Sequence, residues 1–550
     1  MSIRPFECWR KRSTNRSPKP RRKQNSRMED VPMKPIDAIS LVPLDYRPFT
    51  YYTPTQIARI GGFRIRTPDP MLLGAYFTPG DRAAVAEWWE KEASATEASV
   101  VAVPMLAFGG LINSRYSAGI TLEQAQESLE VIKRVKDRYP LHKIYAFDSI
   151  MRLTISPTRD YPGNWSGKIR EWSILKDKVE RMGMDDLRPE YEAVGAVLPQ
   201  DLIDDYLYTR ERNLAVNQRI IDWVREGYID FLIIGQDDAE PYGLHRSERN
   251  RLIEYSNAQG LSGKVKVFPG ADVIASLLIA KLAADSLGVS PKVYVEYSRT
   301  HGDQWIAPYQ DIPYSEVIGN YVSVLGGETV AGAEQADLLL MANTAGGEPI
   351  DSFSDRIQAF IDKGRSVTVG DDAHAGTADP VLIEALRKRI RFSDLTGYSG
   401  WNIGVSIAQA FARWALLHTA REMMRDRLLQ SAQSHLELLL EALAHEEGYR
   451  NHVRGGAVAY ARSLGDDPQR LQTRYEEINA YAITHTEALG DRWYQTHFAG
   501  KEIVLGIEGA KTVYGIVDRL NGWRLLLPWN RTAEMEVFPE LTIVVSSKSE

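Results

Sequence analysis

The feature that most constrains the fold is a repeated alternation between continuous apolar runs and helical patterns over about 370 residues. The runs are rich in Val, Ile and Leu and do not alternate with polar residues, as expected when helices cover both faces of a parallel sheet. The predicted strands span 37–45, 97–106, 143–150, 229–236, 264–268, 292–297, 328–332, 337–343, 366–371 and 395–400. Segments 122–139, 213–227 and 272–288 show the i, i+3, i+4 spacing of helices. Strand–helix alternation of this kind predicts the α/β class.

Two arrangements of these elements fit the pattern. The first is a pair of consecutive doubly wound, mostly parallel sheets, and the second is a closed (β/α)8-like barrel with extensions. The compact strand–helix–strand–strand order within 292–343 favours two sheets, so that arrangement is our prediction.

The predicted organisation has four parts. Residues 33–290 form a first α/β domain, and 291–403 form a second. An aromatic-rich insertion at 152–212 interrupts the first domain, and long insertions of this kind often serve as lids or binding loops. Residues 404–550 form a helical region that ends in a β segment near 502–545.

The N-terminal residues 1–32 have a different composition and are predicted to be a disordered basic tail. The first 27 residues hold ten Lys and Arg against one acid, and Met33 would be a natural start for the folded chain. The net charge is −7 and these first 27 residues contribute +9, so the rest carries −16, which disfavours nucleic-acid binding by the folded part. The single cysteine, Cys8, lies in the tail, which excludes a thiol nucleophile, a Cys-ligated zinc and a disulfide from the folded part.

Several motifs are absent from the sequence. There is no G-x-x-x-x-G-K-[ST] phosphate loop, no G-x-G-x-x-G after the first strand and no H-E-x-x-H. The stretch GYSGW (397–401) departs from the G-x-S-x-G nucleophile elbow at its last position. No apolar stretch reaches the roughly 20 residues of a membrane span, and no secretory signal is recognisable. We therefore expect a soluble cytoplasmic protein that does not bind membranes.

Two pairs of adjacent aspartates follow predicted strands, and they are the candidate catalytic residues. Asp237 and Asp238 follow 229–236, and Asp371 and Asp372 end the strand at 366–371. Ligands bind at the carboxyl ends of strands in α/β folds, and two close carboxylates push each other's pKa apart. One carboxyl can then act as an acid while the other stays ionised, as glycoside cleavage requires.

Other polar residues at strand ends are candidate substrate-binding residues. They are Asp45, Arg47, Ser114, Arg115, Tyr242, His245, Asn343, His374, Trp401 and Asn402. Each also has a structural interpretation. Asp45 and Arg47 could simply pair, His374 could be a loop residue, and Trp401 could be a packing residue instead of a sugar platform.

Two further aspartates also follow predicted strands. We favour a structural role for Asp272 and leave the role of Asp148 open. Asp272 is predicted to cap the helix that follows it, because a carboxylate accepts from the free N–H groups of a first turn. Asp148 could be a site residue or the buried partner of Arg152.

Taken in order, several segments resemble a bacterial family catalogued as a domain of unknown function, number four thousand one hundred twenty-seven. They are LVPLDYRP (41–48), FGGLINSR (108–115), GQDDAEPYGLHRSE (235–248), PGAD (269–272), GDDAHAG (370–376), GYSGWN (397–402) and LLPWNRTAEME (526–536). The chain departs from the family pattern at Val273, where an acidic residue is expected, and at Ala533, where an aromatic residue is usual. The resemblance implies an α/β protein, supplies no catalytic residues, and weakly associates the chain with carbohydrate use.

Three functional hypotheses follow. The first is a hydrolase that acts on a carbohydrate or amino sugar through its paired aspartates, with a small-molecule substrate and no cofactor. The second is a metal-dependent hydrolase or isomerase in which Asp237, Asp372 and His374 bind a divalent metal. The third is a non-catalytic sugar sensor. The sequence does not indicate an oligomeric state.

Overall fold

The computed structural model describes residues 36–117, 119–156, 165–346, 349–419, 423–508 and 511–547. The predicted tail at 1–32 lies outside these ranges. From Pro35 onwards the chain forms a single compact unit, which contains all the elements described below.

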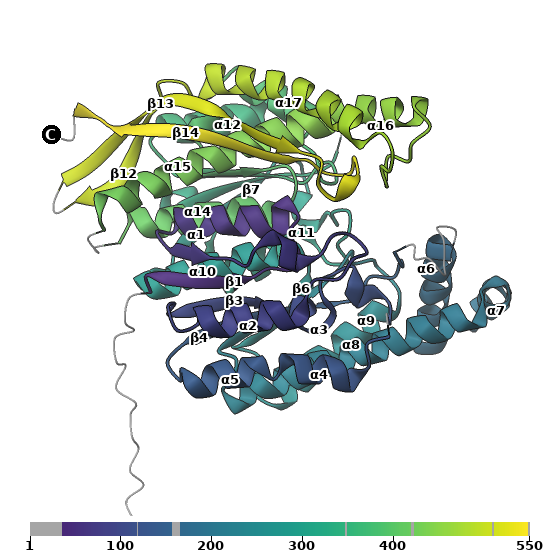
Figure 1. The fold of residues 1–550 in the computed structure, drawn as a ribbon. Helices are drawn as coiled ribbons and strands as arrows, with labels where there is room; N and C mark the ends of the chain where they lie inside the picture. The colour runs from purple at the N-terminus through teal and green to yellow at the C-terminus, as the bar shows by residue number, and fades with distance from the viewer. Residues whose placement is uncertain are drawn as a thin grey trace, which may run out of the picture. The chain divides into compact units, whose positions relative to one another are not determined.

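The first sheet has six parallel strands in the order β2-β1-β3-β4-β5-β6 (Figure 1). Its strands are β1 (Ala38–Val42), β2 (Arg64–Arg66), β3 (Ala98–Ala102), β4 (Lys143–Ile150), β5 (Phe231–Gln236) and β6 (Val265–Pro269). The chain adds β2 on one side of β1 and all later strands on the other side. The carboxyl ends of β1 and β3 therefore flank a topological switch point, where ligands bind in doubly wound folds.

The second sheet repeats the same plan with five parallel strands in the order β8-β7-β9-β10-β11. Its strands are β7 (Lys292–Tyr297), β8 (Glu328–Val330), β9 (Leu338–Asn343), β10 (Val367–Asp371) and β11 (Gly397–Ser399). Two parallel, doubly wound sheets confirm the predicted fold class.

Helices cover both faces of the two sheets. In the first part they are α1 (Thr53–Ile60), α2 (Arg82–Glu92), α3 (Val103–Phe108), α4 (Leu122–Leu129), α5 (Val131–Arg138), α8 (Gln200–Glu226), α9 (Leu244–Ala258) and α10 (Ile274–Leu287). In the second part they are α11 (Tyr314–Val324), α12 (Asp351–Asp362), α13 (Pro380–Leu386) and α14 (Ile403–Leu417).

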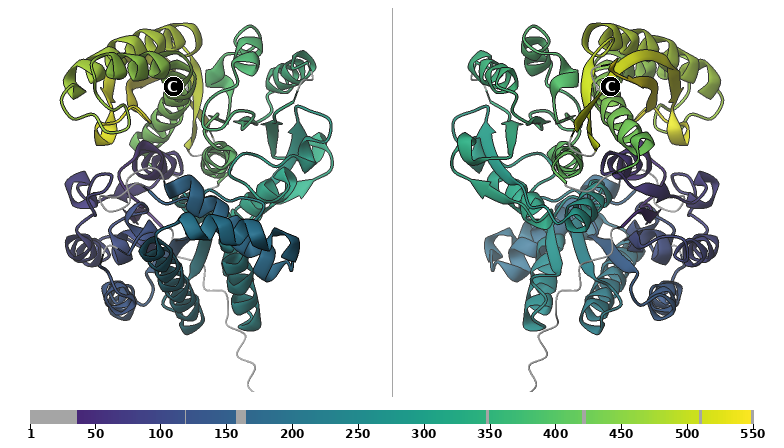
Figure 2. Two further views of the ribbon diagram at one scale, coloured as in Figure 1. Left: turned by 90° about the vertical axis from the view of Figure 1, so that its right-hand side faces the viewer. Right: turned by 90° about the vertical axis from the view of Figure 1, so that its left-hand side faces the viewer.

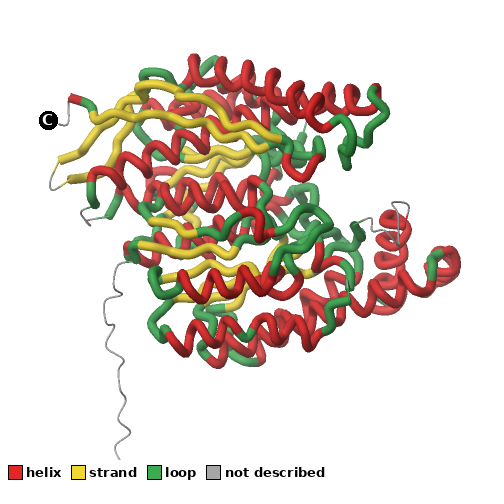
Figure 3. The backbone as a smooth tube through the Cα atoms, in the orientation of Figure 1, coloured by secondary structure: helices red, strands yellow, loops and turns green. Residues whose placement is uncertain are grey.

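A layer of helices shared by both sheets lies between them. Helices α1 and α10 contact α14, which packs in turn on β10 and β11 (Figures 1 and 3). Helices α10 and α14 are apolar around nearly their whole circumference, and such helices are stable only when buried on all sides. One hydrophobic core consequently runs from strands of the first sheet through this layer to strands of the second.

The predicted insertion at 152–212 is helical in its described part. It contains α6 (Trp165–Lys176), α7 (Arg188–Val197) and the first half of α8. These helices enclose a small core of their own around Trp172, Leu202 and Tyr206. Helix α6 also contacts the turn after β5, because the Asp177 carboxylate that follows it accepts from the Gly243 N–H at 3.1 Å.

The C-terminal part combines long helices with a three-stranded antiparallel sheet, as predicted. The helices are α15 (Arg425–Ala442), η9 (Leu443–Val453), α16 (Arg454–Ser463) and α17 (Tyr475–His497). The strands are β12 (Glu502–Glu508), β13 (Lys511–Leu526) and β14 (Glu536–Val545). Figure 2 shows these yellow strands beside the green helices, and α15 packs on β14 while α17 packs on β13.

One predicted strand was partly wrong. The run 97–106 is a strand only over β3, because the chain turns into α3 at Val103 with Pro104 in the first helical turn. Proline suits that position, since the first helical N–H groups have no partner within the helix. The short edge strand β2 has the sequence Arg-Ile-Arg and was not predicted, because one apolar residue between two arginines forms no apolar run.

Candidate functional site

A cavity of about 290 Å³ opens at the carboxyl ends of both sheets. Its wall includes Asp237, Asp238 and Asp272, which follow strands of the first sheet, and Asp372, which follows β10 of the second. The loop after β7 and the residues after β11 complete the wall. Parts of both predicted aspartate pairs therefore face one cavity.

The turn after β5 presents Asp237 and Asp238 to this cavity. The Asp237 N–H continues the sheet ladder by donating to the Ile150 carbonyl at 3.0 Å. Asp238 then has a φ of 41°, in the left-handed region that aspartate tolerates better than most residues. The Ala239 N–H donates to the carbonyl of Tyr309, which also has a left-handed φ of 64°. Such backbone strain often accompanies functional sites.

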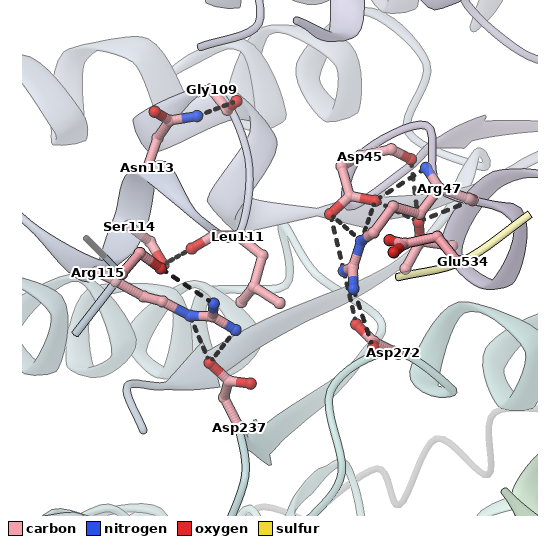
Figure 4. A network of polar contacts seen from close by, with 12 residues as sticks. Asp45, Arg47, Gly109, Leu111, Asn113, Ser114, Arg115, Asp237, Asp272 and Glu534 are labelled. Carbon is pink, nitrogen blue, oxygen red and sulfur yellow. Dashed lines mark hydrogen bonds and ion pairs between the residues drawn. The ribbon is translucent and has the colours of Figure 1, made fainter. Parts of the chain in front are cut away.

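Each of these two aspartates has an arginine partner that is not part of the cavity wall. The Arg115 Nη2 lies 2.7 Å from the Asp237 Oδ2 (Figure 4), and both side chains are almost fully buried. The Arg152 Nη1 lies 3.0 Å from the Asp238 Oδ2. Each carboxylate is thus paired with an arginine outside the wall while it lines the cavity itself.

Arg47 links the first strand to Asp272 on the cavity wall. Its guanidinium lies 2.8 Å from both the Asp45 Oδ2 and the Asp272 Oδ1 (Figure 4). The prediction that Asp272 caps the next helix is wrong, because α10 begins after Val273 without a side-chain cap. A buried guanidinium with too little counter-charge is strongly destabilising, so the pairing of Asp272 with Arg47 outweighs the smaller gain from a helix cap. Burial raises the pKa of Asp272, and Arg47 opposes that rise.

Asp371 and Asp372 point in different directions, as neighbouring residues at the end of a strand do. Asp372 lines the cavity, whereas Asp371 is fully buried and is not in the wall. The Asn343 Nδ2 donates to the Asp371 Oδ1 at 2.7 Å, because the two residues are partners in the β9–β10 register. The Asp379 N–H donates to the other oxygen at 2.7 Å, so Asp371 anchors the loop that carries His374.

Asp372 forms no ion pair with any described residue. The Ile403 N–H donates to its Oδ1 at 3.0 Å. Burial raises the pKa of Asp372 to about 6, against the lowering effects of the Tyr314 hydroxyl and the Ile403 N–H. Burial likewise raises the pKa of Asp371 to about 7. Burial raises the pKa of two acids on the cavity wall, Asp272 and Asp372, and only Asp272 has an arginine partner among the described residues to oppose the rise.

Three predicted substrate-binding residues line the cavity, namely His374, Trp401 and Asn402. Asn402 also caps α14, since its Oδ1 accepts from the Gly404 N–H at 2.8 Å. The Trp401 ring stacks on Phe49 with 3.9 Å between centroids, and the Arg450 guanidinium lies 4.8 Å from the centroid of the same ring. Both faces of Trp401 are therefore occupied, and only its edge is left for a ligand.

The other predicted residues lie outside the cavity wall. Two of them are the arginines at 47 and 115, which pair with aspartates of the wall, and Asp45 pairs with Arg47. Ser114 is buried, and its hydroxyl donates to the Leu111 carbonyl. Asn343 holds Asp371.

Two of them belong to the turn that follows Glu240. Tyr242 is 41% exposed and lies against Lys178. His245 is fully buried and closes the turn through Glu240, and burial lowers its pKa to about 3.

Asp148 does not pair with Arg152, which binds Asp238 instead. The Asp148 carboxyl is 3% exposed and accepts from the Ser149 N–H at 2.8 Å. Burial raises the pKa of Asp148 to about 8.

Sequence reasoning missed several residues of the cavity wall, namely Phe49, Asp272, Tyr309, Gln310 and Arg450. Asp272 follows a predicted strand, as the other candidates do, but the sequence favoured a helix cap for it. Tyr309 and Gln310 lie ten or more residues beyond the end of β7, where no strand-end rule applies. Arg450 lies in η9 and reaches the site from the C-terminal helices.

The residues considered as metal ligands, Asp237, Asp372 and His374, all line the cavity. Within the described ranges, no group of three or more His, Cys, Asp or Glu side chains has an arrangement that could hold a metal ion.

The sequence model of one protein family matches residues 39–537, nearly the whole chain. That family is described as "Protein of unknown function (DUF4127)". The chain belongs to this family. The predicted resemblance is thereby confirmed, and the aspartates, arginines and loop residues of the cavity all lie within the part that matches the DUF4127 family.

Comparisons beyond the DUF4127 family add little. No curated protein matches the chain significantly. Among solved structures, the carboxyl transferase domain of Rhizobium etli pyruvate carboxylase is 9% identical, with 93% of this chain and 88% of that chain covered, at a TM-score of 0.16. The same domain with 3-bromopyruvate is 9% identical, with 93% of this chain and 88% of that chain covered, at a TM-score of 0.12. TM-scores this low carry no argument about fold or function.

Across the described residues, no helix combines the length and the apolar character needed to cross a membrane.

Proposed function

We propose that this protein is a hydrolase that acts on a carbohydrate or amino sugar through carboxylate acid/base catalysis. The observation that carries the proposal is the shared cavity, where Asp237 and Asp238 of the first sheet and Asp372 of the second line one wall. Cleavage of a glycosidic bond needs one protonated and one ionised carboxyl group on the same substrate.

The environments of these carboxyl groups suggest separate roles. Asp372, with its pKa raised to about 6 and no ion pair among the described residues, would donate a proton to the leaving oxygen. Asp238, paired with Arg152 and 41% exposed at its side chain, would accept a proton from the attacking water or attack the sugar carbon directly. Asp237, fixed by Arg115, would orient a substrate hydroxyl or amine.

The cavity dimensions agree with a small substrate. A volume of about 290 Å³ lies at the lower end of the range for small-molecule sites. Carboxylate and amide side chains on the wall suit a ligand that offers many hydrogen-bond donors, as sugars do.

A sugar-binding protein without catalysis is the second candidate. Its support is the position of the cavity at the carboxyl ends of two doubly wound sheets, where ligands bind in such folds irrespective of chemistry.

The test uses Asp372→Asn and Asp238→Asn, assayed on a panel of aryl glycosides and amino glycosides. Asparagine keeps the shape of each side chain and tolerates the left-handed backbone at 238. We expect each variant to lose about 100-fold or more in kcat/KM, as is typical when a general acid or base is removed.

The matched control is Asp185→Asn, an exposed aspartate outside the cavity wall, which should retain full turnover. Melting temperatures within a few degrees of the parent would show that the folds are intact. Full activity of Asp238→Asn would contradict the proposed role. Sugar binding without any product from the parent protein would favour the second candidate.

A further inference from the structure

The cavity wall presents hydrogen-bond acceptors, whereas most of the arginines that pair with these acceptors lie outside the wall. Asp237, Asp238 and Asp272 belong to the wall, but their arginine partners at 115, 152 and 47 do not. Arg450 is the arginine of the wall. Its guanidinium lies against the Trp401 ring and its Nη1 donates to the Ala533 carbonyl, while its Nε has no hydrogen-bond partner among the described residues. A ligand therefore meets carboxylates that follow three different strands, and these favour hydrogen-bond donors on the ligand.

Gln310 is a second, independent sign of a missing ligand group. It lines the cavity and is only 8% exposed, yet its side-chain Oε1 is buried without a hydrogen-bond partner among the described residues. A buried acceptor without a partner is destabilising, so native proteins rarely leave one unpaired without a reason.

The loop that carries Gln310 is held beside the Asp237–Asp238 turn by the residues on either side of Gln310. The Tyr309 carbonyl accepts from the Ala239 N–H at 3.0 Å. Asp311 is fixed from the other side by Arg246 at 2.8 Å and Arg249 at 2.9 Å. Gln310 thus lies between two anchored residues, in a loop that contacts the Asp237–Asp238 turn and lines the same cavity as the two aspartates.

Tyr309 supplies an aromatic ring at the same place. Its side chain is 61% exposed, lines the cavity and forms no ring contact with the described residues. It differs in this respect from Trp401, whose faces are both covered. A free tyrosine face next to carboxylates is a favourable environment for an organic cation.

We propose that the ligand of this cavity carries a protonated amine, which is bound by Asp237, Asp238 and the Gln310 amide with the Tyr309 ring beside it. The substrate class is then amino sugars, not neutral sugars. An ammonium group fits because it offers three donors and a charge to a group of acceptors, whereas a hydroxyl offers one donor. This inference rests on the proposed function only in taking the cavity as the substrate site.

The test is calorimetric titration of the full chain with sugars that differ at one group. Glucose, 2-amino-2-deoxyglucose, 6-amino-6-deoxyglucose and N-acetylglucosamine separate charge from size. We expect at least one amine to bind ten-fold or more tightly than glucose and N-acetylglucosamine. Equal affinities, tighter binding of the neutral sugars, or no binding of either amine would overturn the proposal.

Variants of Gln310 and Tyr309 then test the binding residues. Gln310→Met and Tyr309→Leu should each weaken amine binding about ten-fold, whereas Gln310→Glu, which keeps an acceptor and adds charge, should bind the amine at least as well as the parent. Loss of amine binding in Gln310→Glu would show that the amide serves as a donor and would contradict the proposal. The control is Tyr242→Leu, an exposed tyrosine on the neighbouring turn but outside the cavity wall, which should leave binding unchanged.

Failure of this inference and failure of the proposed function give different results. Tight amine binding without cleavage would refute the hydrolase and leave the ammonium site standing. Cleavage confined to neutral glycosides would refute the ammonium site and leave the hydrolase standing.

Discussion

At the scale of single residues, the buried carboxyl of Asp148 shows how an isolated acid makes stability depend on pH. It has one N–H donor, from Ser149, and no ion pair among the described residues. Burial raises its pKa from an ordinary value of 3.8 to about 8 in the folded chain. Between those two values the folded state holds a proton that the unfolded state has released.

Ionising Asp148 inside the folded protein is unfavourable, so the free energy of unfolding falls as the pH rises from about 4 to about 8. We predict that Asp148→Asn, which stays neutral, unfolds at a higher urea concentration than the parent at pH 8, and that the gain shrinks towards pH 5. Urea titrations at the two pH values measure the difference. A gain that does not change with pH would contradict the raised pKa, and the exposed variant Asp185→Asn should show no such gain.

At the scale of elements, the site depends on how closely the ends of strands approach the helices that follow. A Cβ added at Gly235 in β5 would lie 1.8 Å from the Gly270 carbonyl oxygen and 2.4 Å from the Ile274 side chain. The absent side chain lets β5 pair with β6 as far as Gln236 and Pro269, which lie shortly before the cavity residues Asp237 and Asp272.

We predict that Gly235→Ala destabilises the protein by about 1–3 kcal/mol or more, because the contact is with backbone that cannot rotate away. The same change should weaken ligand binding, since it displaces both cavity segments. The matched control is Gly319→Ala in α11, where a Cβ meets nothing within 4 Å. That helical alanine should stabilise by up to about 1 kcal/mol. Equal unfolding free energies for the two variants would contradict the prediction.

At the scale of the whole described unit, the helices between the two sheets belong to both of them. Residues of α1, α10, α11 and α14 share one hydrophobic core with strands of each sheet. Neither sheet can lose its structure without exposing the apolar helices α10 and α14 to water.

We therefore predict that the two sheets unfold in one cooperative transition. Hydrogen exchange, followed by mass spectrometry in increasing urea, should give the same opening free energy for amides of β4 and β9. Far-UV circular dichroism and tryptophan fluorescence should give coincident curves. Two separate transitions would show instead that the sheets behave as independent domains.

Much of the fold was predictable because its signals are local in the sequence. Buried parallel strands need continuous apolar runs, so strands such as β4, β5 and β9 could be recognised one by one. The apolar run of β3 failed as a guide at Val103, because a buried strand and a buried helix look alike in composition.

By itself, the sequence determined the α/β class, the succession of strands and helices, and the two aspartate pairs at strand ends. Only the tertiary structure decided which members of those pairs share a cavity, because that depends on how the two sheets turn towards each other. It placed Asp237, Asp238 and Asp372 together and turned Asp371 into the interior. It also added Asp272, Tyr309, Gln310 and Arg450, since contacts between distant segments are set by packing and leave no local pattern.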